Sequence, residues 1–548
     1  MKTKKAMKKI THIGMAALVA MGMLGTSCNK AESPEIETPE TQKENIVTLT
    51  TTVGFAADDT KALTGAGVKT FGAGDQMAVI YKNTSGGTVK AVGTLTSGAG
   101  TKSGTFTFTL TNPDKTQNVT YIYPAAMAGE TDVDYTKLNS QDGTLASLAA
   151  NLDYCTESGA WDGENLPTLT LENQLAILAI TLKNEAGTSD ITGSTTKLTV
   201  SDGTNTYNVN RSVAAGPIYV AIRPTSDATI DITATSDSKG YYKILTTPKS
   251  YTASNGYSVS WKMTQGAILS KLTAAYTAQN GDKLTGTLGS NVKISITDGA
   301  TVTLDGVSIN ASGSWTSGNY AGITCAGDAT ITLEGTNTVK GFADGYPGIS
   351  VSSGKTLVIN GTGELNANSN GSYDTGSGGA GIGGGDNMNC GNIEIQSGTV
   401  TATGNQYGAG IGGGQNANCG NITISGGTVT ATGGYRAAGI GGGRRGTSGT
   451  KNGYDSASCG NITISGGTVT ATGGQNAAGI GGGRGNTVYY KSSCGTITIT
   501  SGVTSVTATK GSGADNSIGA GNVGTCGTVT IGGNVGAITT SPYTYPAE

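Results

Sequence analysis

Histidine is almost absent from this 548-residue chain, since its one histidine is His12, near the amino terminus. The rest of the chain therefore has no imidazole to act as a general base, to complete a Ser-His-Asp triad or to bind a metal. Aromatic residues make up 5% of the chain and charged residues 13%. The low charge argues against a disordered protein, and the 90 glycines favour β structure with many turns.

Acidic residues are also scarce in the carboxyl-terminal part of the chain. From residue 376 onward there are five: Asp386, Glu394, Asp455, Asp515 and Glu548. They never pair at strand spacing, whereas glycoside hydrolysis needs two facing carboxylates and lyase chemistry needs a positioned base. We therefore expect no enzyme. A polysaccharide-active enzyme stays as a third alternative, because parallel β-helices often carry such activities.

A repeated motif organises the second half of the chain. Blocks built around Gly-Ile-Gly-Gly-Gly are each followed by Cys-Gly-Asn-Ile or a close variant. Between them, runs such as Thr-Val-Thr-Ala-Thr at 428–432 alternate at period two and are separated by glycine pairs, which is typical of short strands and turns. The repeat predicts a right-handed parallel β-helix, in which each coil buries its inward side chains against its neighbours.

Fixed positions in the repeat predict two side-chain ladders. The cysteines recur every 29 to 40 residues, at Cys390, Cys419, Cys459, Cys494 and Cys526. Neighbouring coils are about 4.8 Å apart, and parallel side chains point the same way, so we expect buried thiols, with occasional disulfides as the alternative. Asn392, Asn421 and Asn461 would share one turn position, where Asn tolerates left-handed backbone and bonds to the next coil.

The amino terminus has the pattern of an export signal. Five lysines within the first nine residues precede an apolar run over 13–24, which is too short for a stable transmembrane helix. The small residues Gly25, Thr26 and Ser27 then precede Cys28. This arrangement resembles a bacterial lipoprotein signal, which implies removal of residues 1–27 and attachment to the outer membrane through a lipidated Cys28. An ordinary cleaved signal peptide is the alternative.

The chain that follows the signal is acidic. Removing residues 1–27 takes away five lysines and no acid, which changes the formal net charge from −3 to −8. This balance argues against nucleic acid as a partner. Residues 28–44 are rich in Glu and Pro and are predicted to be a polar tether.

Residues 45–265 are predicted to form two β-sandwich lobes, 45–155 and 156–265. Alternating apolar runs recur there between Gly- and Asn-rich turns, and one short helix is expected within 143–152. The expected strands are 46–55, 76–81, 88–95, 104–110, 118–123, 167–171, 175–182, 197–201, 217–222, 229–234, 241–246 and 257–263.

Several segments of these lobes carry a family likeness. They are Val-Gly-Phe-Ala at 53–56, Gly-Asp-Gln-Met-Ala-Val at 74–79, Tyr-Ile-Tyr-Pro at 121–124 and Tyr-Val-Ala-Ile-Arg-Pro at 219–224. Together with the lipoprotein signal, they resemble the fimbrillin-like family. The resemblance implies a fimbrial subunit, a fimbrial anchor or a surface lipoprotein. Some members release a donor strand by cleavage after an arginine; Lys61 stands at the comparable place here, which argues against that route of polymerisation.

The segment 266–548 is similar to β-helical carbohydrate-binding domains of secreted bacterial proteins. Aromatic faces cover the C–H surfaces of sugars while amides and arginines bind hydroxyls, and the insertions of a repeat protein usually mark its binding face. The alternative is that the loop tyrosines only cover the edges of the coils. The carbohydrate-binding candidates are Trp315, Tyr320, Tyr407, Tyr435, Arg436, Arg444, Tyr454, Arg484, Tyr489 and Tyr490.

A calcium site is a weaker hypothesis for the early coils. Asp298, Asp305 and Asp328 lie near the ends of predicted strands. Calcium takes six to eight oxygen ligands, so three aspartates would supply only part of a site. The alternative is that each aspartate caps a turn. No other cofactor is expected.

These observations favour a cell-surface lipoprotein adhesin. Its β-helix loops would bind carbohydrate, as a glycan or another ligand on a host or bacterial surface. The alternative is a fimbrial accessory or anchor subunit, with fimbrial subunits as partners and the β-helix as a structural spacer.

Overall fold

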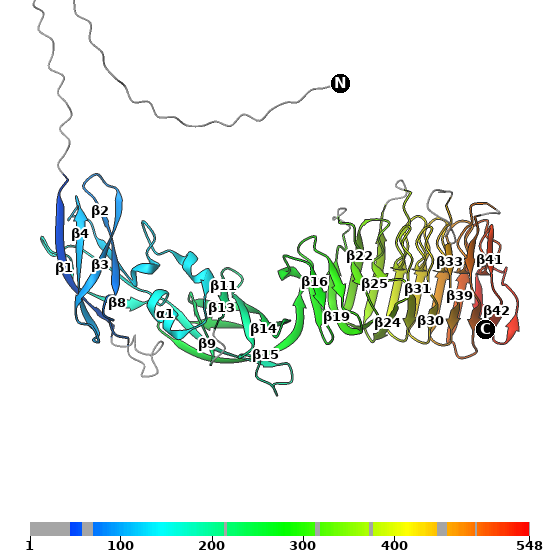
Figure 1. Cartoon of the computed structure of the whole chain (residues 1–548), viewed down its shortest axis with the longest axis horizontal. Coiled ribbons are helices and arrows are strands. Elements are labelled where there is room, and N and C mark those ends of the chain that lie inside the picture. The colour runs from blue at the N-terminus through cyan, green and yellow to red at the C-terminus, as the bar shows by residue number, and fades with distance from the viewer. Residues whose placement is uncertain are drawn as a thin grey trace, which may run out of the picture.

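The computed structural model describes residues 44–56, 69–212, 216–312, 318–371, 376–446, 457–487 and 490–546. Three all-β parts follow one another along the long axis: a barrel, a two-sheet lobe and a parallel β-helix (Figure 1). The predicted fold class is confirmed. Cys28, Lys61, Trp315, Tyr454 and Tyr489 lie outside the described residues. In the described part of the chain, no helix has the length and apolar character needed to cross a membrane.

The first part is a closed barrel with the strand order β1-β4-β3-β2-β5-β7-β8. Side chains alternate between the inside and the outside of the barrel along each strand. In β4, Phe106, Phe108 and Leu110 have no exposed surface, while the threonines between them point outward. Where the sequence predicted a sandwich, pairing continues round both edges, because β1 pairs with β4 on one side and with β8 on the other. The strands are β1 (Ile46–Phe55), β2 (Gln76–Lys82), β3 (Thr88–Ser97), β4 (Ser103–Thr111), β5 (Val119–Tyr123), β7 (Cys155–Gly159) and β8 (Leu169–Asn173).

The second part is a sandwich of two sheets. One sheet has the order β6-β11-β10-β13-β14, and the other places β9 between β12 and β15. The predicted helix is present as α1 (Leu145–Asn151), which begins after Thr144 because the Thr144 side chain accepts a hydrogen bond from the Ser147 amide. The strands are β6 (Ser140–Gln141), β9 (Ala176–Asn184), β10 (Thr195–Ser201), β11 (Thr206–Asn210), β12 (Ile218–Ile222), β13 (Thr225–Ser236), β14 (Lys239–Tyr251) and β15 (Gly256–Ile268).

The predicted boundary between the two lobes at 155/156 is wrong, because the chain crosses between them three times. After β5, the chain forms the 3-10 helices η1 (Ala125–Met127) and η2 (Tyr135–Asn139), β6 and α1, whose apolar side chains join the core of the second lobe. It then returns to add β7 and β8 to the barrel. Strands β7 and β11 were not predicted, because their segments Cys-Thr-Glu-Ser-Gly and Thr-Tyr-Asn-Val-Asn are mostly polar.

The third part is a parallel β-helix with three walls of strands. Each coil contributes a short strand to a nine-stranded sheet and then one strand to each of two further rows. The nine-stranded sheet contains β16 (Tyr276–Ala278), β18 (Ile294–Ile296), β20 (Ile323–Cys325), β23 (Ile349–Val351), β26 (Ile382–Gly383), β29 (Ile411–Gly412), β32 (Ile440–Gly441), β36 (Ile480–Gly481) and β40 (Ile518–Gly519).

The two other rows carry the Ile-x-Ile and Thr-Val-Thr-Ala-Thr segments. The first row is β17 (Lys283–Thr287), β19 (Ala300–Ile309), β21 (Ala329–Glu334), β24 (Thr356–Gly361), β27 (Asn392–Ile395), β30 (Ile422–Ile424), β34 (Ile462–Ile464), β38 (Ile497–Ile499) and β42 (Val529–Ile531). The second row continues from the end of β19 through β22 (Thr336–Asp344), β25 (Glu364–Asn370), β28 (Thr399–Thr403), β31 (Thr428–Thr432), β35 (Thr468–Thr472) and β39 (Ser505–Thr509).

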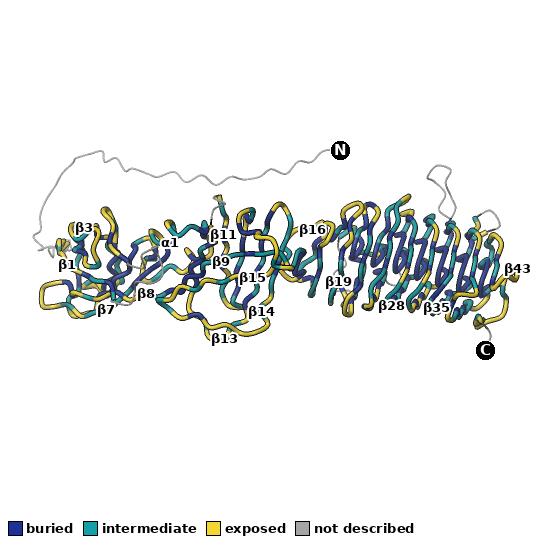
Figure 2. The backbone as a smooth tube through the Cα atoms, turned by 90° about the horizontal axis from the view of Figure 1, so that it is seen from below, coloured by how far each residue is buried: buried dark blue, intermediate teal, exposed yellow. Residues whose placement is uncertain are grey.

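Identical residues stack on one another through the β-helix core. Ile411, Ile440 and Ile480 pair in register in the nine-stranded sheet, and none has exposed surface. Figure 2 shows buried residues recurring in every coil, as expected when each coil covers the core of the next. The glycine after each of these isoleucines is also required: Gly441 has a φ of 131°, and a Cβ there would lie 2.0 Å from the Gly481 carbonyl oxygen.

Both ends of the β-helix are covered. At the amino-terminal end, β15 pairs with β9 of the sandwich and then, from Gly266 to Ile268, with β17 of the first coil. The domain start that the sequence predicts at residue 266 lies within this shared strand. At the other end, β43 (Asn534–Val535) and β44 (Tyr543–Tyr545) pair antiparallel with β42 and β39 and occupy strand edges that would otherwise invite further pairing.

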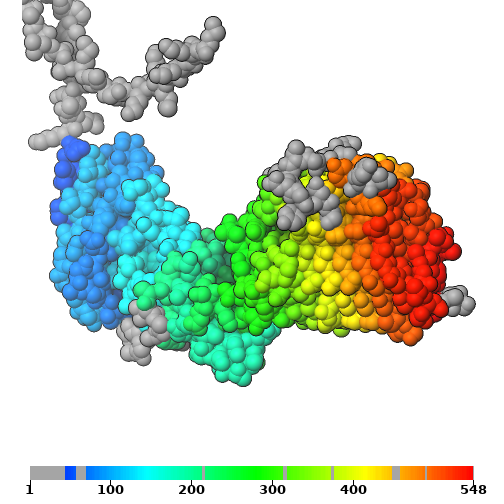
Figure 3. Space-filling view, turned by 45° about the vertical axis from the view of Figure 1, so that its right-hand side comes forward, coloured from blue at the N-terminus to red at the C-terminus, as the bar shows by residue number. Residues whose placement is uncertain are grey.

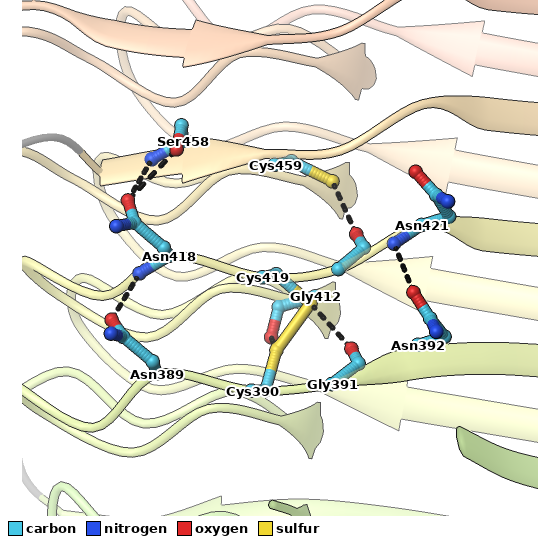
Figure 4. Close-up of a disulfide and its surroundings, with 11 residues drawn as sticks. Asn389, Cys390, Gly391, Asn392, Gly412, Asn418, Cys419, Asn421, Ser458 and Cys459 are labelled. Carbon is cyan, nitrogen blue, oxygen red and sulfur yellow. Dashed lines mark hydrogen bonds between the residues drawn. A yellow bond between two sulfur atoms is a disulfide. The ribbon is translucent and has the colours of Figure 1, made fainter. Parts of the chain in front are cut away.

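The cysteines stack where the repeat predicts them, but they are not all thiols. Cys390 and Cys419 form a disulfide (Figure 4), so the prediction of free thiols is wrong for this pair. The other three stacked cysteines, Cys459, Cys494 and Cys526, are not disulfide-bonded. They lie in register in a small sheet formed by β33 (Ala457–Cys459), β37 (Ser492–Cys494) and β41 (Gly524–Cys526).

The predicted asparagine ladder bonds from coil to coil. The Asn392 side-chain oxygen accepts a hydrogen bond from the Asn421 amide at 2.8 Å, and the Asn421 side-chain oxygen accepts one from the Asn461 amide at 2.8 Å. A second ladder, unpredicted, joins Asn389, Asn418 and Ser458 on the other side of the cysteines (Figure 4). The left-handed conformation expected for the first ladder occurs instead at Asn387, Asn416 and Asn476.

Candidate functional site

The candidate site is the edge of the β-helix where the Ile-Gly strands begin and end. The turn that leaves one of these strands hydrogen-bonds to the turn that enters the strand of the preceding coil. The Arg444 amide donates to the Tyr407 carbonyl oxygen at 2.9 Å, and the Arg484 amide donates to the Arg436 carbonyl oxygen at 3.0 Å. We call the side chains of Tyr407, Tyr435, Arg436, Arg444 and Arg484 the arginine strip.

The repeat itself aligns the members of this strip. The residue after each Gly-Gly-Gly occupies one column, which holds Asp386, Gln415, Arg444 and Arg484 in successive coils. A second column lies beside the first and is formed by the turns that lead into the Ile-Gly strands. It holds Tyr407 and Arg436, whose carbonyl oxygens accept the hydrogen bonds from the Arg444 and Arg484 amides. Side chains from a span of 78 residues, Tyr407 to Arg484, are therefore gathered along a few coils of the stack.

Tyrosine rings and guanidinium groups contact one another in the strip. The Arg444 guanidinium lies 4.3 Å from the centre of the Tyr407 ring, and the Arg436 guanidinium lies 5.0 Å from that of Tyr435. Burial lowers the pKa of Arg444, and the positive charges of Arg436 and Arg484 lower it further, against an attraction to Tyr407. The strip is thus a concentrated positive charge held on aromatic faces.

Several polar atoms along this edge are buried without a partner among the described residues. They are Asp386 Oδ1, Gln415 Oε1, Arg436 Nε and Arg484 Nε. Burial raises the pKa of Asp386 to about 6, partly offset by a hydrogen bond with Asn387. Buried polar atoms in native proteins normally bond to protein, water or ligand, so this edge has unused binding capacity.

A polar groove of about 330 Å³ adjoins the strip. The groove residues include Lys340, Asn368, Asn405 and Gln406, and Gln406 immediately precedes Tyr407. Lysine and amide side chains of this kind supply donors and acceptors for hydroxyl groups. The sequence analysis did not single out Lys340, Asn368 or Gln415; the column position of Gln415 after Gly-Gly-Gly was the available signal for that residue.

Not every predicted site residue belongs to this edge. Tyr320 packs its ring 4.8 Å from that of Phe342 and bonds through its hydroxyl to Asn291, and it lies three coils from Tyr407, about 14 Å along the stack. Tyr490 is near the strip, under the guanidinium of Arg445 at 5.4 Å. Tyr320 therefore has a packing role, while Tyr407, Tyr435, Arg436, Arg444 and Arg484 come together.

The structure does not bring the three predicted calcium ligands together. The Asp298 carboxylate accepts the Asp328 amide at 2.7 Å and pairs with Lys355 at 3.2 Å, which lowers the pKa of Asp298. Asp328 in turn caps the Thr356 amide, and Asp305 faces Lys283 at 3.6 Å. Within the described ranges, no three histidine, cysteine or acidic side chains are grouped so as to hold a metal ion.

Three stretches of the chain match the family model described as a β-helix repeat: residues 393–415, 422–444 and 462–484. The repeats are β-helix repeats. Each matched stretch runs from the Ile-x-Ile strand to the turn after Gly-Gly-Gly, so the second and third end at Arg444 and Arg484. No curated protein matches the chain.

Two of the solved structures that match this chain come from Bacteroides species. A candidate cell adhesion protein from Bacteroides uniformis is 15% identical, with 40% of this chain and 93% of that chain covered and a TM-score of 0.24. One from Bacteroides ovatus is 10% identical, with 41% and 97% covered and a TM-score of 0.23. At these values the likeness carries no information on function.

Proposed function

We propose that the protein is a cell-surface lipoprotein adhesin that binds a glycan along the arginine strip and the adjoining groove. The observation that carries the proposal is the alignment of tyrosines and arginines from successive coils on one edge. Sugar rings stack on aromatic faces, and amides and guanidinium groups bind the hydroxyls around them. The strip and groove supply both kinds of group side by side.

The proposal is for binding rather than catalysis. Among the described residues of the two columns, Asp386 is the one carboxylate. A hydrolase of the common type needs two carboxyl groups across the scissile bond. The strip offers positive charge and aromatic surface instead, which suits retention of a ligand.

Anchoring through Cys28 and membership of the fimbrillin-like family are part of the same proposal. A fimbrial accessory subunit that accepts a strand from a neighbour needs an open groove. The described strands of the first lobe close into a barrel, so they leave no unpaired edge there for such a strand. This argues against strand acceptance by the first lobe.

A glycan array probed with the chain from residue 29 to 548 tests the proposal. We expect saturable binding to a limited set of glycans, and loss of that binding in Tyr407→Ala and Tyr435→Ala. Tyr135→Ala is the matched control, because Tyr135 is 38% exposed and Tyr435 is 39% exposed. Equal binding by all variants, or no binding by folded protein, would contradict the proposal.

A further inference from the structure

The three arginines of the strip have no acidic partner in the described chain. The ion pairs of the described residues are all made by lysines, and none involves Arg436, Arg444 or Arg484. Neighbouring guanidinium groups repel one another, and the pKa of Arg444 is lowered partly for this reason. A cluster of this kind is stabilised by a bound anion.

Two of these guanidinium groups also hold buried, unused donors. The Nε atoms of Arg436 and Arg484 are buried and have no hydrogen-bond acceptor among the described residues. Leaving a buried donor unpaired destabilises the folded protein. Arginine presents its N–H groups as a planar fork that matches a carboxylate or an oxyanion such as sulfate, and a single sugar hydroxyl cannot fill that fork.

We infer that the arginine strip binds the acidic groups of an anionic polysaccharide, either carboxylates or sulfates. The inference rests on the proposed glycan-binding function and specifies its ligand class. Arg444 and Arg484 occupy the same place in successive coils, so positive charge recurs along the stack at the coil spacing, about 4.8 Å. A polymer with acidic groups on successive units fits such a row better than a single ion does.

The surroundings favour a polysaccharide over a nucleic acid. The whole chain has a net charge of −3, so it has no overall excess of positive charge. Nucleic-acid binders neutralise many phosphates with an extended basic surface. The polar groove beside the strip, lined by Lys340, Asn368 and Asn405, offers partners for the uncharged hydroxyls of a sugar.

Binding of the chain 29–548 to four probes tests the inference: alginate, which carries carboxylates, dextran sulfate, neutral dextran and a single-stranded DNA oligomer. We expect alginate or dextran sulfate to bind at least about tenfold more tightly than dextran, and the preferred one to identify the acidic group. Arg444→Gln and Arg484→Gln are expected to weaken that binding about tenfold with an unchanged melting temperature, and Arg444→Lys to weaken it less.

The matched control is Lys249→Gln, which removes one positive charge from an exposed position in β14 and is expected to leave binding unchanged. Retained binding in both arginine variants would overturn the inference. If the tyrosine variants still lost binding in that case, glycan binding itself would stand. Tightest binding to DNA, or binding to dextran as strong as to the charged polymers, would also overturn the inference.

Discussion

Lys69 shows how single residues specify the first lobe. Its side chain is 8% exposed, and its ammonium group lies 2.9 Å from Asp153 Oδ2 and 3.1 Å from Cys155 Sγ. Burial alone would lower the pKa of Lys69, but attraction to Asp153 and Cys155 raises it instead. Asp153 is fully buried and also accepts a hydrogen bond from Asn173 at 2.6 Å. The charge pair therefore ties the start of β7 to β8 and to the segment before β2.

Replacing Lys69 by Met is expected to destabilise the protein strongly. The substitution would leave the Asp153 carboxylate buried without its cation, which typically costs about 3–5 kcal/mol. Lys90→Met is the matched control: Lys90 pairs with Glu130, which is 86% exposed, so its loss should cost less than about 1 kcal/mol. Thermal unfolding of both variants measures the difference, and equal melting temperatures would contradict this view of Lys69.

Asp386 predicts a pH dependence of stability. Burial raises its pKa in the folded protein to about 6, so the folded state binds the proton more tightly than the unfolded state does. Stability from this group is therefore lost as the pH rises from about 4 through 6. Asp386→Asn is expected to stabilise the protein at pH 7.5 by about 1 kcal/mol, a value reduced for the partial exposure of the group, and to change little at pH 3.5.

Urea unfolding of Asp386→Asn at the two pH values measures this effect. Asp515→Asn, at an exposed turn near the end of the β-helix, is the control and should be neutral at both. A variant that is less stable than the parent protein at pH 7.5 would show that the Asp386 carboxylate is satisfied in the folded state.

At the scale of the element, the coil is defined by positions that contact the coil above and the coil below. Gly412, Gly441 and Gly481 each follow an isoleucine of the nine-stranded sheet and lie against the backbone of the next coil. The asparagine ladder bonds the same coils through side chains. The backbone therefore stacks closely on the side where the arginine strip is displayed.

Gly441→Ala tests the close stacking of coils. The new Cβ would approach the Gly481 carbonyl oxygen to 2.0 Å at a backbone φ of 131°. We expect a loss of about 3 kcal/mol or more, from the clash and the strain together. Gly299→Ala has a φ of 75° but open space around the Cβ, so it should cost about 1 kcal/mol. Similar melting temperatures for the two variants would count against the importance of stacking.

The cysteine ladder predicts a thiol count. The chain from residue 29 to 548 contains seven cysteines, and the structure pairs Cys390 with Cys419. Titration with a thiol reagent in denaturant, without reductant, should therefore find five thiols outside the disulfide, at Cys155, Cys325, Cys459, Cys494 and Cys526. Seven thiols would mean that the ladder is fully reduced, and three would mean that a second pair has formed.

The sequence was most informative where the chain repeats. Periodicity located the coils and the cysteine and asparagine ladders, because each repeat places the same residue type at the same position of the coil. Periodicity did not predict that β7 and β8 return to the barrel of the first lobe. A mostly polar strand such as β7 shows no alternation of apolar and polar residues that would identify it. Periodicity also could not distinguish Tyr320, which packs inward, from Tyr435, because both look alike as loop aromatics.

At the scale of the whole molecule, the two lobes and the β-helix form one elongated body. Strand β15 belongs to both the sandwich and the first coil, so a continuous strand joins these two parts. The space-filling view shows the three parts following one another from the blue barrel to the red end of the β-helix (Figure 3). The described amino terminus lies at the barrel end, far from the strip (Figure 1). In the proposed function, the lobes would hold the binding edge away from the lipid anchor.

A crystal structure of residues 29–548 with the tightest-binding acidic oligosaccharide tests the central claim most directly. We expect sugar rings against Tyr407 or Tyr435 and an acidic group within hydrogen-bond distance of Arg444 or Arg484. An oligosaccharide bound to the barrel or the sandwich, with the arginine strip unoccupied, would contradict it.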